Sequence, residues 1–329
     1  MLSRVADTLL HLGRQLERAE HAARVVETEM ASMLDTAAGQ RRWGLLLESL
    51  ACPAPEPLTS SAAIAAIGFD PELTCSVRSS VAAARESARQ VRERVSTEMF
   101  EQLNALHFFV RGAEAADAWD GADAAFFARV REGVRLFTGI TDATIRHDQG
   151  YFFLRLGRHL ERLDALTRLL RVHLCRPAHG APSGGGDLAE DLEADADAGF
   201  EPDRHLTGVT LLRCVSGYES FLSQHPTGTG LNEVVGFLAL DPGFPRSVRF
   251  AVDAVAHDLQ RIAETAGERL AGGPLRAAGR LRSRVEFTDP GDLVEGGLTL
   301  FLDEVQARAA EVVDGTFSGF VAYPIASVL

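Results

Sequence analysis

The chain has 329 residues, of which 46% are hydrophobic and 24% charged, an ordinary composition for a globular protein. Its net charge of −13 argues against nucleic acid as the main ligand, because phosphate binding needs a cationic surface. All 33 basic residues are arginine, and the absence of lysine excludes a P-loop and Schiff-base chemistry.

The pattern of the first half is typical of a series of helices, because apolar residues recur at a spacing of three and four. The first predicted helix covers residues 5–26, and a second begins near Trp43. Thr59 is expected to cap a short alanine-rich helix. Asp70 is expected to cap one long helix over about 74–110.

The second half continues in the same way after an interruption. Helices are expected through 126–137 and over about 148–174. Residues 177–203, rich in glycine and acidic side chains, are expected to form a mobile loop. Helices resume near the following residues: Asp203, Leu231, Phe244, Pro274 and Pro290. Strand patterns are nearly absent.

Two segments of the chain recur. Residues 12–20 return as 156–164, an offset of 144, and 70–78 return as 241–249, an offset of 171. The two offsets differ by 27 residues, which is the length of the 177–203 loop. One duplication and one insertion account for both matches.

The repeat predicts an all-α helical bundle formed by two pseudo-symmetric repeats of long antiparallel helices. The first repeat covers 1–147, and the second covers 148–329 with its loop at 177–203. We expect the two repeats to form one compact unit.

The recurring helix carries a mid-helix glycine, Gly13 or Gly157, which costs up to about 1 kcal/mol relative to alanine. Such a glycine is tolerated where another backbone comes close. We therefore expect the two copies to cross at these glycines. Arg14 would then reach Glu161, and Arg158 would reach Glu17.

Three interpretations of these charged helices stay open: an ion network that fixes the pairing, a ligand or catalytic pocket, and two solvated surfaces. The candidate general bases are Glu17, Glu20, Glu98 and Glu161. The candidate residues for binding a substrate or partner are Arg14, Arg18, Arg24, Asn104, Asp142, Arg158, Arg162 and Asp164.

Other chemistries lack their motifs. A di-iron site needs two Glu-x-x-His pairs, but the second-copy equivalent of His21 is Ala165. The H-E-x-x-H and G-x-S-x-G motifs are absent as well. We therefore expect neither a metal nor a cofactor.

Four scattered cysteines, with no C-x-x-C pair, predict reduced thiols rather than a zinc site. They are Cys52, Cys75, Cys175 and Cys214.

Charged residues interrupt the opening segment, which therefore does not have the pattern of a secretory signal peptide. No apolar run reaches the length of about 18 residues that a membrane span needs. We expect a cytoplasmic protein without a membrane partner.

Several blocks of the chain resemble the alpha-E domain family of bacterial proteins. The resemblance begins at residues 1–7 and 12–24, and continues in family order at 84–104, 142–164, 241–249 and 279–282. It covers nearly the whole chain. The family usually carries a tryptophan at the position of Phe100, so a stacking role for this residue does not carry over.

The resemblance implies an all-α protein commonly encoded beside, or fused to, a circularly permuted ATP-grasp amide ligase. Together with the absence of nucleotide-binding and nucleophile motifs, it predicts a non-catalytic accessory subunit in peptide or amide-bond synthesis or modification, with an amino acid or peptide as a candidate ligand. The alternative is an enzyme of the same pathway that uses an Arg/Glu pocket at the repeat interface for acid–base chemistry on such a substrate. A purely structural homo-oligomer is a third hypothesis.

Overall fold

The computed structural model describes residues 3–31, 37–113, 122–175, 202–226, 228, 230–266 and 268–321. Within these ranges the regular secondary structure is helical and no strand occurs, so the all-α prediction is confirmed. None of the described helices combines the length and hydropathy of a membrane span.

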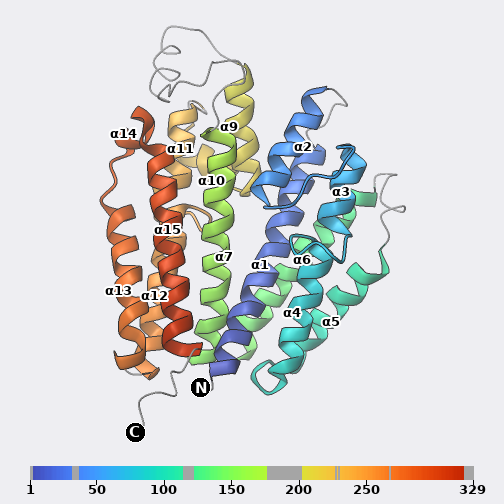
Figure 1. Ribbon diagram of the computed structural model, residues 1–329. Coiled ribbons are helices and arrows are strands. Elements are labelled where there is room, and N and C mark those ends of the chain that lie inside the picture. The colour runs from blue at the N-terminus through green and yellow to red at the C-terminus, as the bar shows by residue number, and fades with distance from the viewer. Residues whose placement is uncertain are drawn as a thin grey trace.

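Two long helices, α1 (Ser3–Ala31) and α7 (Gln149–Leu174), lie side by side at the centre of the bundle (Figure 1). The Asp148 side chain begins α7 by accepting hydrogen bonds from the amides of Gly150 and Tyr151, at 2.9 and 3.4 Å. Both helices start at the end of the bundle where the N-terminus lies, so they run parallel (Figure 1). The ion pairs between them join residues 143 to 147 positions apart.

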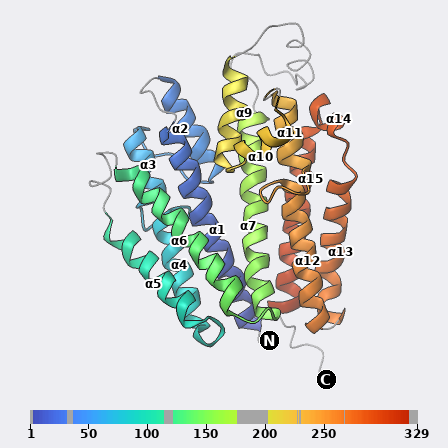
Figure 2. The same cartoon turned by 180° about the vertical axis from the view of Figure 1, so that it is seen from behind.

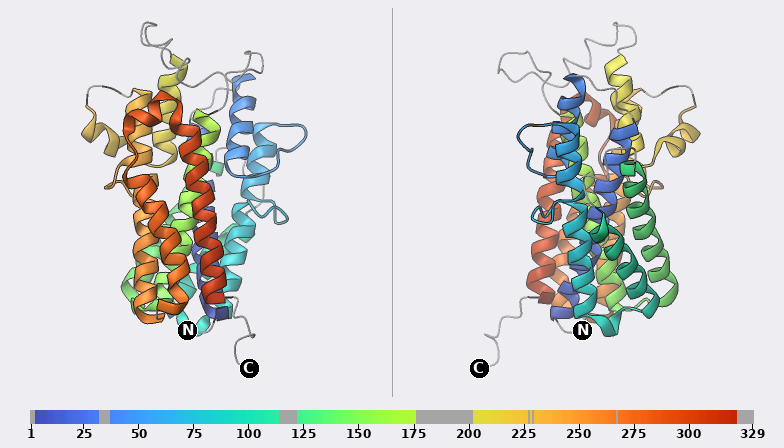
Figure 3. Two further views of the ribbon diagram at one scale, coloured as in Figure 1. Left: turned by 60° about the vertical axis from the view of Figure 1, so that its left-hand side comes forward. Right: turned by 90° about the vertical axis from the view of Figure 1, so that its right-hand side faces the viewer.

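The remaining helices flank this central pair (Figures 1 and 2). On one side lie α2 (Ala37–Ser49), α3 (Ser60–Gly68), α4 (Val77–Gln90), η1 (Arg92–Arg94), α5 (Thr97–Gly112) and α6 (Ala122–Thr144). The second half supplies α9 (Pro202–Cys214), α10 (Tyr218–Gln224), α11 (Leu231–Leu240), α12 (Val248–Ala266), α13 (Glu268–Glu286), α14 (Pro290–Asp292), η2 (Leu293–Gly297), α15 (Leu298–Thr316) and η3 (Phe317–Val321). Helices α12, α13 and α15 pack together beside α7 (Figure 3).

The prediction of one long helix over 74–110 is wrong. Helix α4 ends at Gln90, and a new helix, α5, begins after Ser96, whose hydroxyl accepts a hydrogen bond from the Met99 amide at 3.2 Å. Ser96 is a good N-cap residue, and this cap stabilises a fresh start for α5. The cap on Thr59 is confirmed, because its hydroxyl accepts from the Ala62 amide at 3.2 Å.

Asp70 does not cap α4. Its side chain accepts from the amide of Glu72 at 2.8 Å and forms a turn, while Ser76 caps the helix by accepting from the Ser79 amide at 3.0 Å. The matching segment before α12 makes the same bonds: Asp241 accepts from the Gly243 amide at 2.7 Å, and Ser247 accepts from the Phe250 amide at 3.0 Å. A repeat would produce such matching turns; the duplication itself stays a prediction.

The expectation that all four cysteines are reduced is wrong for two of them. A disulfide joins Cys52, after α2, to Cys75, before α4, across 23 positions in sequence, with their Cα atoms 5.5 Å apart. The loop through α3 brings these two distant positions together, which their spacing in sequence does not reveal. Cys175 and Cys214 are free.

The predicted mobile loop over 177–203 lies almost entirely outside the described residues. The described chain resumes at Pro202, where α9 begins, so the last two positions of that range are helical.

The largest side chains in the buried core of the bundle are aromatic, and they include Trp43, Phe127, Phe153 and Phe301.

Candidate functional site

The backbones of α1 and α7 touch at the two mid-helix glycines. A Cβ atom added at Gly13 would lie 2.0 Å from the carbonyl oxygen of Leu154, and one added at Gly157 would lie 2.0 Å from that of Leu10. No side chain fits at either distance. The predicted crossing at these glycines is therefore confirmed, and its reason is close backbone approach.

Reciprocal ion pairs hold the crossing beside the glycines. Arg14 Nε and Arg18 Nε donate to Glu161 at 2.9 and 2.6 Å. Arg162 donates from Nε and Nη2 to the two oxygens of Glu17, at 2.6 and 2.8 Å. This bidentate geometry is strong and directional. The predicted contact between Arg14 and Glu161 is confirmed.

The predicted contact between Arg158 and Glu17 is wrong. Arg162, one helical turn farther along α7, occupies both oxygens of Glu17, and the guanidinium of Arg158 makes no hydrogen bond or ion pair with the described part of the chain. Burial, followed by the nearby charge of Arg162, lowers the pKa of Arg158.

Glu20 lies at the centre of a second group of charges. Arg24 Nη1 donates to it at 2.5 Å, Arg246 Nη2 at 2.8 Å, and Arg135 Nε at 3.3 Å. Only Arg24 belongs to the same helix, so this group ties α1 to α6 and to the turn before α12. Arg24 also donates to the backbone oxygen of Cys214 at 2.6 Å, which brings in the end of α9.

The three carboxylates at the crossing are buried and held in the ionised form. Glu17, Glu20 and Glu161 are 3%, 2% and 1% exposed. Burial favours the protonated acid, but the adjacent guanidinium groups outweigh it and keep each pKa below its usual range. A carboxylate with a lowered pKa is a poor proton acceptor, so none of the three suits a general base at neutral pH.

Within the described residues, arginines outnumber the carboxylates in this region. They are Arg14, Arg18, Arg24, Arg135, Arg158, Arg162 and Arg246, around three glutamates. The arginines in excess of these three glutamates can bind an anionic group of a ligand, such as a carboxylate.

Three predicted site residues lie away from the crossing. Glu98 is exposed in the first turn of α5, and Asn104 on the same helix accepts a hydrogen bond from Arg85 at 2.7 Å. Asp142 accepts from the hydroxyl of Tyr151 at 3.0 Å. The other predicted residues all belong to α1 or α7, whose crossing brings them together.

A buried pair that no sequence motif indicates joins α7 to α12. His159 Nδ1 is 2.7 Å from Asp258 on α12, and Arg155 Nε is 3.4 Å from the same carboxylate. Burial, opposed by Asp258, lowers the pKa of His159 to about 4, so its imidazole is neutral at neutral pH. The two residues are 99 positions apart in the chain, so only the docking of α12 against α7 brings them together.

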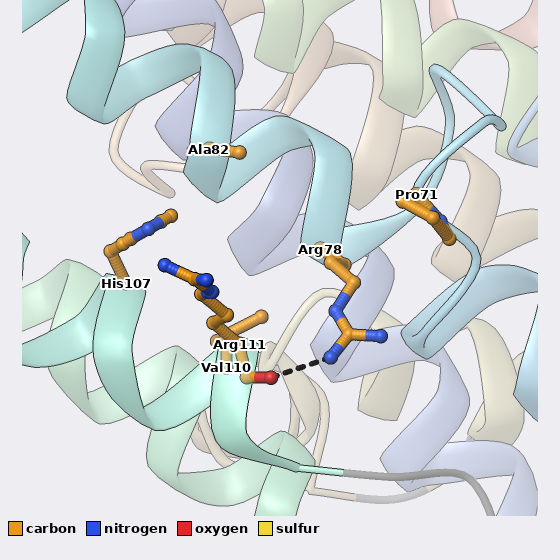
Figure 4. Close-up of a pocket in the computed structure, with 6 residues that line it drawn as sticks. All are labelled: Pro71, Arg78, Ala82, His107, Val110 and Arg111. Atoms are coloured by element: carbon orange, nitrogen blue, oxygen red, sulfur yellow. Dashed lines mark hydrogen bonds between the residues drawn. The ribbon is translucent and has the colours of Figure 1, made fainter.

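A separate cavity of about 370 Å³ opens between α4 and α5 (Figure 4). Its polar lining is basic: Arg78, His107 and Arg111. The Arg78 guanidinium donates to the backbone oxygens of Arg111 and Ala113 at 2.6 and 3.1 Å, so it ties α4 to the end of α5. None of the predicted site residues lines this cavity.

The described residues contain no group of three His, Cys, Asp or Glu side chains placed to hold a metal ion.

Residues 1–318 match a family described as a predicted alpha-helical domain with a conserved ER motif. The chain belongs to the Alpha-E family. Two Glu-Arg dipeptides, Glu17-Arg18 and Glu161-Arg162, meet where α1 and α7 cross, and each glutamate binds an arginine of the opposite helix. No curated protein and no solved structure matches the chain.

Proposed function

We propose that this Alpha-E protein is a non-catalytic accessory subunit that works with an ATP-grasp amide ligase in peptide or amide-bond synthesis or modification. The resemblance to alpha-E proteins encoded beside such ligases suggests the partner. The observation that carries the non-catalytic role is the state of Glu17, Glu20 and Glu161. Each is bound by arginine at 2.9 Å or less and has a lowered pKa.

The alternative is an enzyme of the same pathway with an Arg/Glu pocket at the repeat interface. It requires a carboxylate that can accept a proton near neutral pH. Of the four candidate bases, three are held as anions at the crossing, and the fourth, Glu98, is exposed on α5. This arrangement favours the accessory subunit.

Co-purification with the neighbouring ligase, followed by ligase assays with and without the full chain, tests the proposal. We expect a stable complex and a ligase whose kcat/KM for its acceptor substrate rises when the chain is present. A ligase that neither binds the chain nor responds to it would contradict the proposal.

A second assay uses the chain alone and separates the accessory role from the enzymatic one. Glu98→Gln is compared with the control Glu86→Gln on α4, where the glutamate side chain is 47% exposed. We expect no turnover of ligase substrates or products by the parent or by either variant. Turnover by the parent that Glu98→Gln abolishes and Glu86→Gln retains would establish the enzyme instead.

We also propose a cytoplasmic location, where an ATP-dependent ligase has its nucleotide. The Cys52–Cys75 disulfide argues in the opposite direction, because disulfides are rare in reducing compartments. Acid quenching of intact cells, followed by denaturation and thiol alkylation, decides between them, because Cys52 and Cys75 are buried in the folded protein. The proposal requires that both cysteines are alkylated without prior reduction, and a pair that reacts only after reduction would contradict it.

A further inference from the structure

We infer that a pocket bounded by α1, α7 and α15 binds a free amino acid. Arg14 holds the carboxylate of the ligand, and Asp164 and Asp314 hold its ammonium group. The inference rests on the proposed function and deepens it, because an amino acid is a substrate class that amide ligases join.

The pocket is small, and part of its lining is apolar. Its volume is about 240 Å³, below the roughly 300–1,000 Å³ of sites for drug-sized ligands. The apolar lining comes from Leu160 on α7 and from Ala309, Ala310 and Val313 on α15. A ligand of few atoms with a short side chain fits such a space.

Arg14 has the geometry of a carboxylate-binding residue. Its Nε donates to Glu161 at 2.9 Å, which fixes the orientation of the guanidinium. Its two Nη atoms donate no hydrogen bond within the described part of the chain, and the side chain is 29% exposed. A planar guanidinium held on one edge presents its free donors to a carboxylate in a defined direction.

Two carboxylates line the same pocket and supply the opposite charge. Asp164, 43% exposed, uses Oδ2 to accept from Arg168 at 3.0 Å and leaves Oδ1 without a hydrogen bond in the described structure. Asp314 is exposed, and its side chain makes no hydrogen bond or ion pair with the described residues. The same holds for Gln306, which also lines the pocket. One cation and two anions around so small a space complement a zwitterion better than a simple anion.

The two halves of the chain differ at this place. Glu20, which matches Asp164 in the sequence repeat, receives Arg135 and Arg246 from other elements. In the described structure Asp164 receives no cation from outside α7, and the pocket lies beside it. A ligand ammonium would give Asp164 the kind of external cation that arginine side chains give Glu20.

The test uses the full chain and the twenty standard L-amino acids, first in a thermal-shift screen. Isothermal titration then compares the amino acid with the largest shift with its N-acetyl and its C-terminal amide derivatives. We expect saturable binding of the free amino acid, and affinities at least about tenfold weaker for both derivatives, because each loses one charge-assisted contact.

Asp314→Asn is the test variant, because the described structure gives the Asp314 side chain no contact on which folding depends. We expect it to weaken binding about tenfold without a change in the melting temperature of the free protein. Glu311→Gln is the matched control: it removes the same charge from the same helix, at a 51% exposed side chain that pairs with Arg280 outside the pocket. We expect the control to bind as the parent does.

Three results would each overturn the inference: no amino acid gives a saturable shift, the N-acetyl derivative binds as tightly as the free amino acid, or Asp314→Asn binds as the parent does. These outcomes are distinct from those of the ligase assay. A chain that stimulates the ligase but binds no amino acid leaves the proposed function standing and removes only this pocket.

Discussion

Replacing Gly13 by alanine tests the most unusual contact of the fold. In an ordinary helix interior this change stabilises by up to about 1 kcal/mol, because alanine has the higher helix propensity. At Gly13 the new Cβ would lie 2.0 Å from the carbonyl oxygen of Leu154, which is backbone and has no other rotamer to adopt. The two helices must therefore move apart by more than about 1 Å before the atoms reach an ordinary van der Waals separation.

Such a movement does not stay local. The hydrogen bonds from Arg14 and Arg18 to Glu161 are 2.9 and 2.6 Å long, so the same displacement breaks or weakens them. Separating a buried charge from its partner costs roughly 3–5 kcal/mol, against the gain of about 1 kcal/mol in propensity. We expect Gly13→Ala to lower the free energy of unfolding by at least about 2 kcal/mol.

Urea denaturation followed by circular dichroism at 222 nm measures this effect through the midpoint and slope. The matched controls are Gly139→Ala on α6 and Gly279→Ala on α13, because both glycines are exposed within helices and an added Cβ meets nothing within 4 Å. We expect both controls to stabilise the protein by about 0.5–1 kcal/mol. If Gly13→Ala also stabilises it, the backbone contact does not hold the crossing.

Three further results are expected from the same denaturation assay. Glu20→Gln should destabilise the fold by roughly 3–5 kcal/mol, because three arginines lose a buried partner, whereas Asp164→Asn should cost less than about 1 kcal/mol at a side chain that is 43% exposed. Burial lowers the pKa of His21 to about 3 and of His159 to about 4. The folded state thus binds these protons more weakly than the unfolded chain. The stabilising contribution of the two neutral imidazoles should be full above a pH of about 6.5. As the pH decreases to about 4, the free energy of unfolding should fall by up to about 1.4 kcal/mol per pH unit for each imidazole, and a stability independent of pH over this range would contradict the assignment. In protein purified in air without a reductant, dithiothreitol should lower the free energy of unfolding by about 3 kcal/mol, the entropy of a loop of some 23 residues, and no change would indicate that the disulfide is not formed in that sample.

Local patterns in the sequence were sufficient for most helices. Thr59 and Asp148 mark helix starts by their type alone, because a short polar side chain satisfies the free amides of the first turn. The same rule misplaced the start of α4. Asp70 and Ser76 are both good caps, and only the fold selects the serine as the cap and leaves the aspartate to the preceding turn.

The crossing was predictable because a glycine inside a helix lowers helix stability and is tolerated where a second backbone comes close, and the repeat identified the two helices that meet. The partners were predictable only in part. The helices α1 and α7 run parallel, and their facing residues are about 145 positions apart in the sequence. Two arginines one helical turn apart, at i and i+4, therefore lie within reach of each glutamate on the opposite helix. Glu161 binds both of its arginines, whereas Glu17 binds Arg162 alone, and side-chain packing rather than helix period decides between these outcomes.

The contacts that the sequence did not reveal come from other elements. Arg246 reaches Glu20 across 226 positions, and Asp258 reaches His159 across 99. No periodicity connects such pairs, since they depend on how the flanking helices dock against the central two. The Cys52–Cys75 bond is of the same kind, because a loop rather than a motif brings the two residues together.

The two faces of the crossing differ in a way that assigns them different roles. Backbone contact at two glycines and the reciprocal pairs of Glu17 and Glu161 already fix how α1 and α7 meet. Further charges around the crossing are therefore not needed for its geometry. On one face of the crossing, Glu20 is buried and binds Arg135 and Arg246 from neighbouring elements. On the other face, Asp164 has no such partner in the described structure, and a pocket lined in part by Arg14 lies beside it. A site on a rigid frame needs binding groups that are held in place but unsatisfied, and Arg14 on this second face meets both conditions.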